Sequence, residues 1–410
     1  MDTSVERRRT VSPIDWPSAS ESMRDSMRRL PAFVQLPLTY LTGKPFTDQR
    51  GLRLTPTSHL VGALGSIAVG LICSATAYHA IGATSLLVAL FVPGWMLTLH
   101  GLRNLRMMVY HQCAHRNMWA NTRADRMVGN IVAGLLLVQN LEQYSREHIG
   151  EHHALHHMSL RDPTVQAMLV GLGLRPGMTR AQMWRRVICQ LLSPTFHARF
   201  AWGRLRSHVY NMSLPRLLAT VASYGCAIAI VTWADLWMFA ALAWVFPLTI
   251  PFQISNVLRL CVKHVFPDAD TTVRRGTRYF GSLTNAIFLG DRAPERSLPP
   301  VRRMVAWVGW TWRLIFVHGM VRYLVLTGDT VCHDYHHRHP MSRDWPNYIF
   351  ARQRDVDTGH PGWPPYREVW GLVPAINVVF DSLSRADPVE YDLAHLGEVN
   401  QRELFSAFDD

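Results

Sequence analysis

LTPTSHLVGALGSIAVGLICSATAYHAIGATSLLVALFVPGWMLTLHGL, which is residues 54–102, contains no Arg, Lys, Asp or Glu. The apolar run is interrupted at residues 78–82. This break divides it into two stretches of about 20 residues, each long enough to cross the hydrocarbon core of a bilayer as a helix. The run therefore predicts a hairpin of two membrane-spanning helices.

A second apolar block, residues 214–258, carries only Arg216 and Asp235 as charges. A break at residues 233–235 again gives two spans, so the sequence predicts two hairpins. The turns of both hairpins lack Arg and Lys, whereas the segments flanking the hairpins are rich in Arg. Basic residues accumulate in cytosolic segments, so we expect both termini and the segment between the hairpins to face the cytosol. The predicted fold is all-α and integral to the membrane, with four transmembrane helices and a cytosolic helical cap.

Two weaker apolar segments are assigned differently. Residues 127–141 are too short to span a bilayer. Residues 304–326 are interrupted by charges and contain three Trp residues, which favours a helix at the membrane interface over a fifth span. The predicted organisation is a cytosolic N-terminal arm at 1–53, a membrane domain at 54–385 and a C-terminal tail at 386–410.

Composition agrees with a membrane protein. Of the 410 residues, 48% are apolar and 18% are charged, against a usual charged share of about 25%, which argues against an ordinary soluble enzyme. The net charge of +12 comes almost wholly from Arg, since Lys44 and Lys263 are the only lysines. We interpret this charge as an orientation signal and expect no nucleic-acid partner. The Arg bias suggests a GC-rich bacterial genome and hence a bacterial inner membrane.

The 20 histidines are clustered. The first box, His111-Gln112-Cys113-Ala114-His115, places two imidazoles four residues apart on one helical face, where they can share a metal. The third box, at residues 333–337, has the pattern HxxHH. The second box, at residues 148–157, contains HxxHH and a further pair four residues apart. The candidate ligands of these boxes are His111, His115, His153, His156, His157, His333, His336 and His337.

Three further histidines remain open at this stage. His264 follows the fourth predicted span and mirrors the position of the first box. His148 and His152 form the additional pair in the second box, and their side chains either join the metal site or lie beside it. No ExxH pattern occurs in the sequence, so we expect a metal site built from nitrogen ligands alone, unlike soluble di-iron carboxylate bundles.

These boxes and their spacing from the spans resemble the membrane-bound fatty acid desaturase superfamily, over roughly residues 55–380. The resemblance implies two irons on the cytosolic side of a four-helix bundle, and it implies His264 as a further ligand. In the animal acyl-CoA branch of that family an Asn stands four residues before this His, whereas here the residue is Leu260. The segment Arg161-Asp162-Pro163 also resembles the family, and Asp162 is expected to orient a ligating imidazole.

The implied function is an O₂-dependent oxidoreductase with two Fe ions, for which zinc can substitute in preparations. Removing hydrogen from an unactivated carbon requires a metal–oxygen oxidant that no side chain supplies. We expect desaturation of a fatty acyl chain or related lipid; the alternative is a hydroxylase or ketolase acting on an apolar substrate. We expect electrons from a separate ferredoxin, rubredoxin or cytochrome b5 type donor. His156→Ala or His336→Ala should abolish activity and metal loading.

Other interpretations compete. Residues 148–152 form an HxxEH pattern, which is typical of a zinc protease, but this assignment leaves the other boxes without a role. A metal transporter would need ionisable groups within the spans, and the span centres contain no Asp or Glu. His360-Pro361-Gly362-Trp363 is similar to a cytochrome b5 haem loop but lacks its second Gly, so we expect a turn there. We interpret His318, His339 and His360 as structural or surface histidines.

Overall fold

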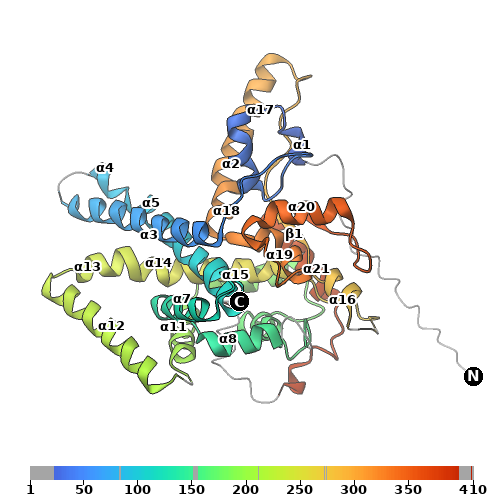
Figure 1. The fold of residues 1–410 in the computed structure, drawn as a ribbon. Helices are drawn as coiled ribbons and strands as arrows, with labels where there is room; N and C mark the ends of the chain where they lie inside the picture. Colours follow the sequence, from blue (N-terminus) through green and yellow to red (C-terminus); the bar gives the residue numbers. More distant parts are fainter. Residues whose placement is uncertain are drawn as a thin grey trace, which may run out of the picture.

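The computed structural model describes residues 23–82, 85–150, 156–210, 212–271, 273, 275–396 and 408. These residues are mostly helical, and two long helix pairs extend from one side of a cap of shorter helices (Figure 1). The first pair consists of α3 (Pro56–His79) and one continuous helix. That continuous helix is made of α5 (Phe91–Asn104), η1 (Leu105–Tyr110) and α6 (His111–Ala114).

Close backbone packing holds the first pair together. Thr55 caps the N-terminus of α3 by accepting a hydrogen bond from the Ser58 N–H. A Cβ atom added at Gly70 of α3 would lie 2.5 Å from Oγ1 of Thr98 in α5, so no larger residue fits there without a shift. Small residues at helix crossings are the usual way in which apolar helices approach closely in lipid.

The second pair consists of α12 (Leu214–Trp233) and a longer helix, residues 237–263. The longer helix comprises α13 (Trp237–Ala240), η4 (Ala241–Val245), α14 (Phe246–Leu248) and α15 (Ile250–Lys263). None of the α12 side chains is buried, which for an apolar helix of this length is expected where lipid surrounds it. The indole N–H of Trp95 in α5 donates to the carbonyl of Leu242 at 2.8 Å and joins the two pairs.

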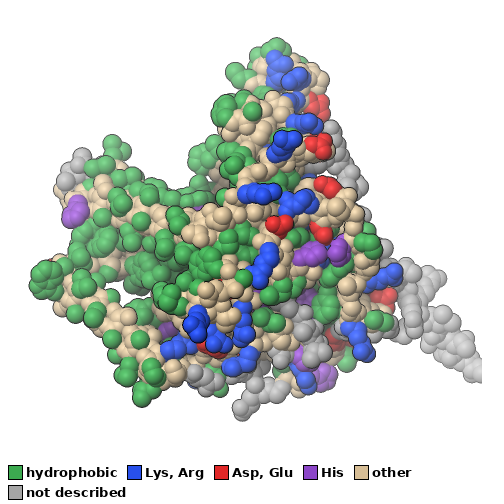
Figure 2. All heavy atoms as spheres, in the orientation of Figure 1, with side chains coloured by type: hydrophobic (Ala, Val, Ile, Leu, Met, Phe, Trp, Pro, Cys, Tyr) green, Lys and Arg blue, Asp and Glu red, His purple; other side chains and the backbone are tan. Residues whose placement is uncertain are grey.

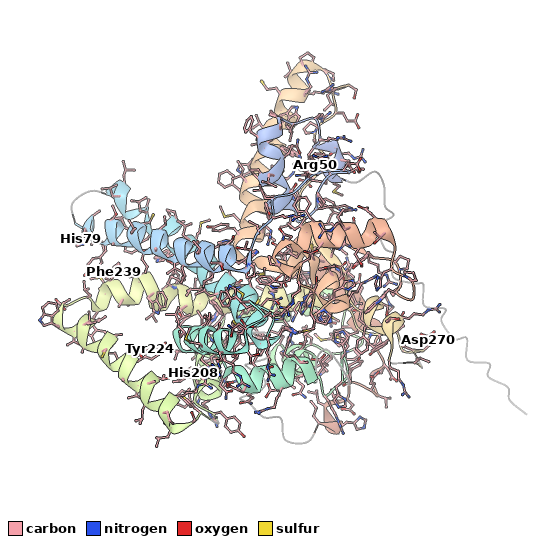
Figure 3. All side chains as sticks on the ribbon, viewed as in Figure 1. Arg50, His79, His208, Tyr224, Phe239 and Asp270 are labelled. Atoms are coloured by element: carbon pink, nitrogen blue, oxygen red, sulfur yellow. The ribbon has the colours of Figure 1, made fainter. Side chains whose placement is uncertain are left out.

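The tips of the two pairs meet on the side away from the cap. The rings of Tyr78 and Phe239 have centroids 5.7 Å apart. Figure 3 shows His79 and Phe239 toward these tips, whereas Arg50 and Asp270 lie on the other side of the molecule. In Figure 2 apolar side chains cover the two pairs, and Lys, Arg, Asp and Glu lie mainly over the rest. The four predicted spans thus fall on helices of membrane-spanning length and composition.

A fifth helix of this kind, residues 300–324, is one more than the sequence analysis assigned as a span. It consists of α17 (Pro300–Arg313), η5 (Leu314–Gly319) and α18 (Met320–Leu324), and α2 (Ala32–Thr42) packs along it. It extends in a different direction from the two pairs (Figure 1). Its large exposed apolar side chains, apart from Val317, recur at helical spacing and form one stripe: Val301, Met304, Val305, Val308, Trp312, Ile315 and Phe316.

The cap packs on the ends of the helix pairs that lie opposite the tips. Its core is continuous with theirs, running from Leu102 through Val262 to Ile376 of α21 (Leu372–Arg385). The all-helical prediction misses one small feature, a parallel pair of three-residue strands, β1 (Ala286–Phe288) and β2 (Glu368–Trp370). The other cap helices that bear on the site are α7 (Thr122–Leu136), α8 (Leu141–Glu147), α9 (Pro163–Gln166), α10 (Arg180–Leu191), α11 (Pro194–Val209), α16 (Thr277–Ser282), η6 (Gly328–Cys332), α19 (His333–Arg338) and α20 (Tyr348–Thr358). The remaining short elements are α1 (Met23–Ser26), α4 (Ser85–Val88), η3 (Ala167–Gly171), η7 (Trp345–Asn347) and η8 (Leu393–His395).

Candidate metal centre

The first box lies where the second helix of the first pair enters the cap. The π-helical segment η1 precedes it directly, and wide turns of this kind occur often at functional sites. His111 and His115 follow on α6 and at its C-terminal end, with ring centroids 4.8 Å apart. Both side chains are buried. The predicted pairing of these two imidazoles on one helical face is therefore seen.

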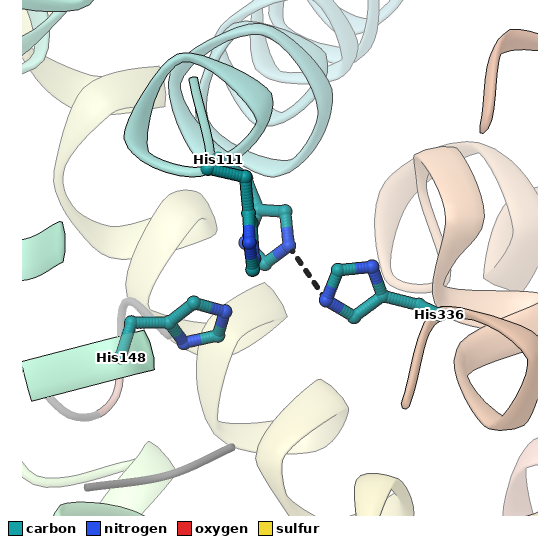
Figure 4. Close-up of side chains that lie close together, drawn as sticks. His111, His148 and His336 are labelled. Atoms are coloured by element: carbon teal, nitrogen blue, oxygen red, sulfur yellow. Dashed lines mark hydrogen bonds between the residues drawn. The ribbon is translucent and has the colours of Figure 1, made fainter. Parts of the chain in front are cut away.

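A four-histidine group forms around them: His111, His115, His148 and His336. Each side chain offers one ring nitrogen, and these nitrogens all lie within 4.8 Å of one another. Nε2 of His111 and Nε2 of His336 are 3.0 Å apart, and Figure 4 shows the rings of His111, His148 and His336 turned toward a common point. His148, which directly follows α8, was left open by the sequence analysis and belongs to this group.

Aromatic contacts orient the four-histidine group. The hydroxyl of Tyr144 lies 3.1 Å from Nδ1 of His111, which leaves Nε2 of His111 facing the other imidazoles. The Tyr144 ring also stacks on His148, with centroids 5.0 Å apart. The buried Arg106 guanidinium lies over the Tyr144 ring at 4.3 Å. Hydrogen bonding at one imidazole nitrogen fixes the position and basicity of the other, which is how ligating histidines are usually held.

A three-histidine group lies beside the first: His264, His333 and His337. Nε2 of His333 is 3.2 Å from Nε2 of His264 and 3.1 Å from Nε2 of His337. All three side chains are buried. His264 directly follows α15 and is held in extended backbone by a bridge to Thr284. The structure therefore brings the isolated His264 to the third box; its role as a ligand, which the family resemblance implied, stays a prediction. Leu260, four residues earlier, lies in the apolar core.

His157 lies against the three-histidine group, with its ring centroid 4.8 Å from that of His264 and 5.0 Å from that of His337. Nδ1 of His157 is 3.8 Å from Oδ2 of Asp162. Asp162 caps α9 by accepting the Thr164 N–H at 2.9 Å, so its carboxylate is fixed. This carboxylate therefore faces one nitrogen of the imidazole, at a distance longer than a hydrogen bond; the orienting role expected of Asp162 stays a prediction.

One predicted ligand of the second box is placed differently, and another is not described. Among the described residues, His156 belongs to neither histidine group, and its side chain is only half-buried. His153 lies outside the described residues, as does His152. The role predicted for His153 and His156 stays a prediction.

The helix α19 joins the two groups. This six-residue helix gives His336 to the four-histidine group and His333 and His337 to the three-histidine group. The His336 ring centroid lies 6.0 Å from that of His333 and 5.8 Å from that of His337. The two groups are thus adjacent, and one rigid element sets the spacing between them.

A buried ion pair fixes α19. Asp334, within the third box, accepts hydrogen bonds from Nε of Arg352 at 3.0 Å and from its terminal nitrogen at 2.8 Å. Arg352 also reaches Glu368 at 3.3 Å, and its guanidinium lies over the Tyr366 ring. Burial alone would lower the pKa of Arg352, but Asp334 and Glu368 raise it above its ordinary value. The pair is therefore ionised and anchors the helix that carries three of the histidines.

The donor set fits a pair of first-row metal ions. Each group consists of imidazoles alone among the described residues, which agrees with the all-nitrogen prediction. Burial raises the pKa of the neighbouring Cys332 thiol, and Cys332 belongs to neither histidine group. Neutral imidazole suits Fe and Zn. A zinc site built only from the HxxEH pattern at 148–152 would leave unexplained why His148 lies with His111, His115 and His336.

Comparisons with known proteins do not assign this chain to a family. No family model matches the sequence, and no curated protein matches it closely enough to be counted as a relative. The function is therefore inferred from the geometry of the site.

Proposed function

We propose that this chain is an O₂-dependent membrane oxidoreductase that holds two iron ions and desaturates the acyl chain of a lipid. The observation that carries the proposal is the position of α19, which presents histidines to two adjacent imidazole groups at once. One iron would be held by His111, His115, His148 and His336. The other would be held by His264, His333 and His337, with His157 beside them.

When bound, such a pair of irons, with O₂ and two external electrons, supplies the oxidising power that hydrogen removal from an unactivated carbon requires. The protein positions the imidazoles and excludes water from the site. The Tyr144 hydroxyl meets the outward nitrogen of His111, and the Asp162 carboxylate faces a nitrogen of His157 at 3.8 Å. Around them lie fully buried apolar side chains, including Val109, Val262 and Val331, which exclude water from the centre.

A cavity of about 630 Å³ supports a lipid-like substrate, because ligand pockets are commonly a few hundred to a thousand Å³ and mostly apolar. It lies between the first helix pair and α18, and its walls include Met96, Asn104 and Gly328. Asn104 stands seven residues before His111 on one continuous helix, and Gly328 opens the η6 segment that leads directly into α19. Two walls of the cavity thus continue into the elements that carry the histidines.

The charged group in this cavity favours a substrate with an anionic head. Arg322 lines the cavity and donates to the carbonyl of Tyr40 at 2.7 Å, to the carbonyl of Leu326 and to the hydroxyl of Tyr348 at 2.7 Å. All three acceptors are neutral oxygens; the carboxylate that feels the charge of Arg322 is that of Asp329, which is buried and does not line the cavity. A carboxylate or phosphate head group would complement the guanidinium while the chain occupies the apolar part of the cavity.

The proposed membrane arrangement has four spans, with α17 in the interface. If the two helix pairs cross the bilayer, α17, which extends in a different direction, lies along the membrane surface (Figure 1). Its exposed apolar stripe would then enter the boundary between head groups and acyl chains, while α2 packs against it from another side. The Arg-rich cap and both termini would face the cytosol of a bacterial cell, where a separate electron donor can reach the cap.

Mass spectrometry of lipids from cells that express the protein, or its His336→Ala variant, tests the function. Desaturation predicts lipids that have lost two hydrogen atoms with the wild type and not with the variant, at equal amounts of protein in the membrane. Lipids that gain one oxygen atom would instead support the hydroxylase or ketolase alternative. Identical lipids in both strains, with iron-loaded wild-type protein and a reductase present, would contradict an oxidoreductase.

A further inference from the structure

A third cluster of metal-binding side chains lies away from both histidine groups. Nε2 of His339 is 3.2 Å from Oδ2 of Asp355, and Nδ1 of His360 is 3.6 Å from Oδ1 of the same carboxylate. One ligand atom from each of the three side chains lies within 4.8 Å of the others. The sequence analysis treated His339 and His360 as structural or surface histidines, since they match no box.

The two imidazoles of this cluster are arranged like those of the proposed metal centre. The ring centroids of His339 and His360 are 5.1 Å apart, with an interplanar angle of 84°. For His264 and His337 the corresponding values are 4.7 Å and 84°. In both pairs the rings stand edge to face.

The carboxylate is fixed and ionised. The Tyr366 hydroxyl donates to Oδ2 of Asp355 at 2.6 Å. Burial by itself raises the pKa of Asp355, but the hydrogen bonds from Tyr366 and His339 outweigh it, and the pKa is lowered. The nearest cation on the same turn, Arg338, is directed to the Pro364 carbonyl and the face of Tyr366.

The cluster is open to solvent on one side. The side chains of His339, Asp355 and His360 are 24%, 14% and 39% exposed, unlike the buried histidines of the two groups. His339 ends α19, Asp355 is on α20, and His360 lies in the turn after Gly359, whose φ of +66° ends α20. An ion bound there would tie the end of α19 to α20.

We propose that His339, Asp355 and His360 hold a single zinc ion, with water as its fourth ligand. Two imidazoles, one carboxylate and an open position form a known zinc ligand set. Mg²⁺ and Ca²⁺ prefer oxygen ligands and would not use this pair of nitrogens. The site is independent of the two irons, since none of its side chains belongs to either histidine group. Its role is to clamp the helix that carries His333, His336 and His337.

The chain contains a matched reference site. Nε2 of His318 is also 3.2 Å from a carboxylate oxygen, that of Asp291, but the second partner there is Arg313 rather than an imidazole. An ordinary His–Asp hydrogen bond of the same length thus exists in the same protein without a zinc ligand set. His318→Ala is therefore the control for substitutions in the cluster.

The test is zinc titration of iron-loaded, full-length protein in detergent. The wild type and His318→Ala should each bind one zinc ion per chain that His360→Ala and Asp355→Asn do not bind, with iron content equal in all four. The affinity loss should exceed the roughly 10- to 100-fold typical of losing an outer partner of a ligand. Equal zinc binding by all four proteins would overturn the proposal.

A measurement on the wild type alone covers the case in which a variant fails to fold. Anomalous scattering at the zinc edge from zinc-soaked crystals should give a peak between His339, Asp355 and His360. A map without that peak, in crystals whose iron peaks are present, would show that the three side chains form only a hydrogen-bonded network.

Discussion

The two histidine groups share α19 but are fixed by different means. In the four-histidine group an aromatic side chain, Tyr144, meets the outward nitrogen of His111 and stacks on His148. Beside the three-histidine group a carboxylate, Asp162, faces His157. A hydroxyl leaves an imidazole neutral, whereas a carboxylate makes it more basic. If both groups bind metal as proposed, this comparison predicts two metal positions with different electron density at their nitrogens, held by one helix.

The largest effects are expected from substituting a ligand that belongs to one histidine group alone. His336→Ala should remove the iron of the four-histidine group and His337→Ala that of the three-histidine group, and each should abolish turnover, since both irons are needed. Iron analysis of the purified variants, alongside oxygen consumption, measures this. His395→Ala, at an exposed histidine that belongs to neither group, serves as the control. Full turnover by either ligand variant would contradict the assignment.

The next largest effect is expected from loss of the ion pair that anchors α19, the helix that both groups share. Arg352→Met leaves Asp334 as a buried carboxylate without its cation, which should cost about 3–5 kcal/mol and loosen both groups together. The matched control is Arg354→Met on the same helix. Arg354 pairs with Asp344 at the same 2.8 Å but is more than half exposed, so its loss should cost less than about 1 kcal/mol. Unfolding free energies in detergent compare them, and equal losses would show that the Asp334–Arg352 pair is not an anchor.

A pH-dependent effect arises just before α19. Burial raises the pKa of Asp329 from 3.8 to about 6, partly offset by Arg259. Since the folded protein holds this proton more tightly than the unfolded chain, the favourable contribution is complete below pH 4 and is lost as the pH rises to 6. Asp329→Asn should therefore stabilise the protein at pH 7.5 by up to about 3 kcal/mol and not at pH 4. Unfolding of both proteins at the two pH values measures it; a gain that is equal at both would contradict the shift.

The smallest effects are expected from the side chains that differ between the two groups, Tyr144 and Asp162. Tyr144→Phe should weaken only the iron of the four-histidine group, and Asp162→Asn only that of the three-histidine group, each by roughly 10- to 100-fold in metal affinity. Asn is as good a helix cap as Asp, so the start of α9 should be unaffected. Stepwise iron removal by a chelator distinguishes the two positions. If both variants weakened the same iron, the assignment of these partners would be wrong.

Local spacing in the sequence was enough to predict several helices and several of the histidine pairs. The uncharged run at 54–102 indicated α3 and α5, and residues four apart, such as His111 and His115, necessarily share a helical face. The three histidines of the third box lie on one short helix, α19, so their closeness also followed from local spacing. His264 has no local partner; its position after the fourth span made it a candidate, and the family resemblance implied it as a ligand before the structure placed it beside His333.

The sequence did not predict which residues far apart in the chain come together. Nothing in the spacing of His148 decides whether it joins the four-histidine group, because α8 reaches that group only through the fold. Asp334 and Arg352 are 18 residues apart, and their pairing depends on how α20 packs on α19. The length and hydropathy of residues 300–324 permit a span, and their direction relative to the helix pairs is a tertiary property.

Iron K-edge X-ray absorption of the purified, iron-loaded protein, together with its iron content, tests the central claim most directly. We expect two irons per chain, a ligand shell dominated by imidazole nitrogen, and an iron neighbour near each iron. One iron per chain, or a shell dominated by sulfur or carboxylate oxygen, would contradict a pair of irons held by the histidines around α19.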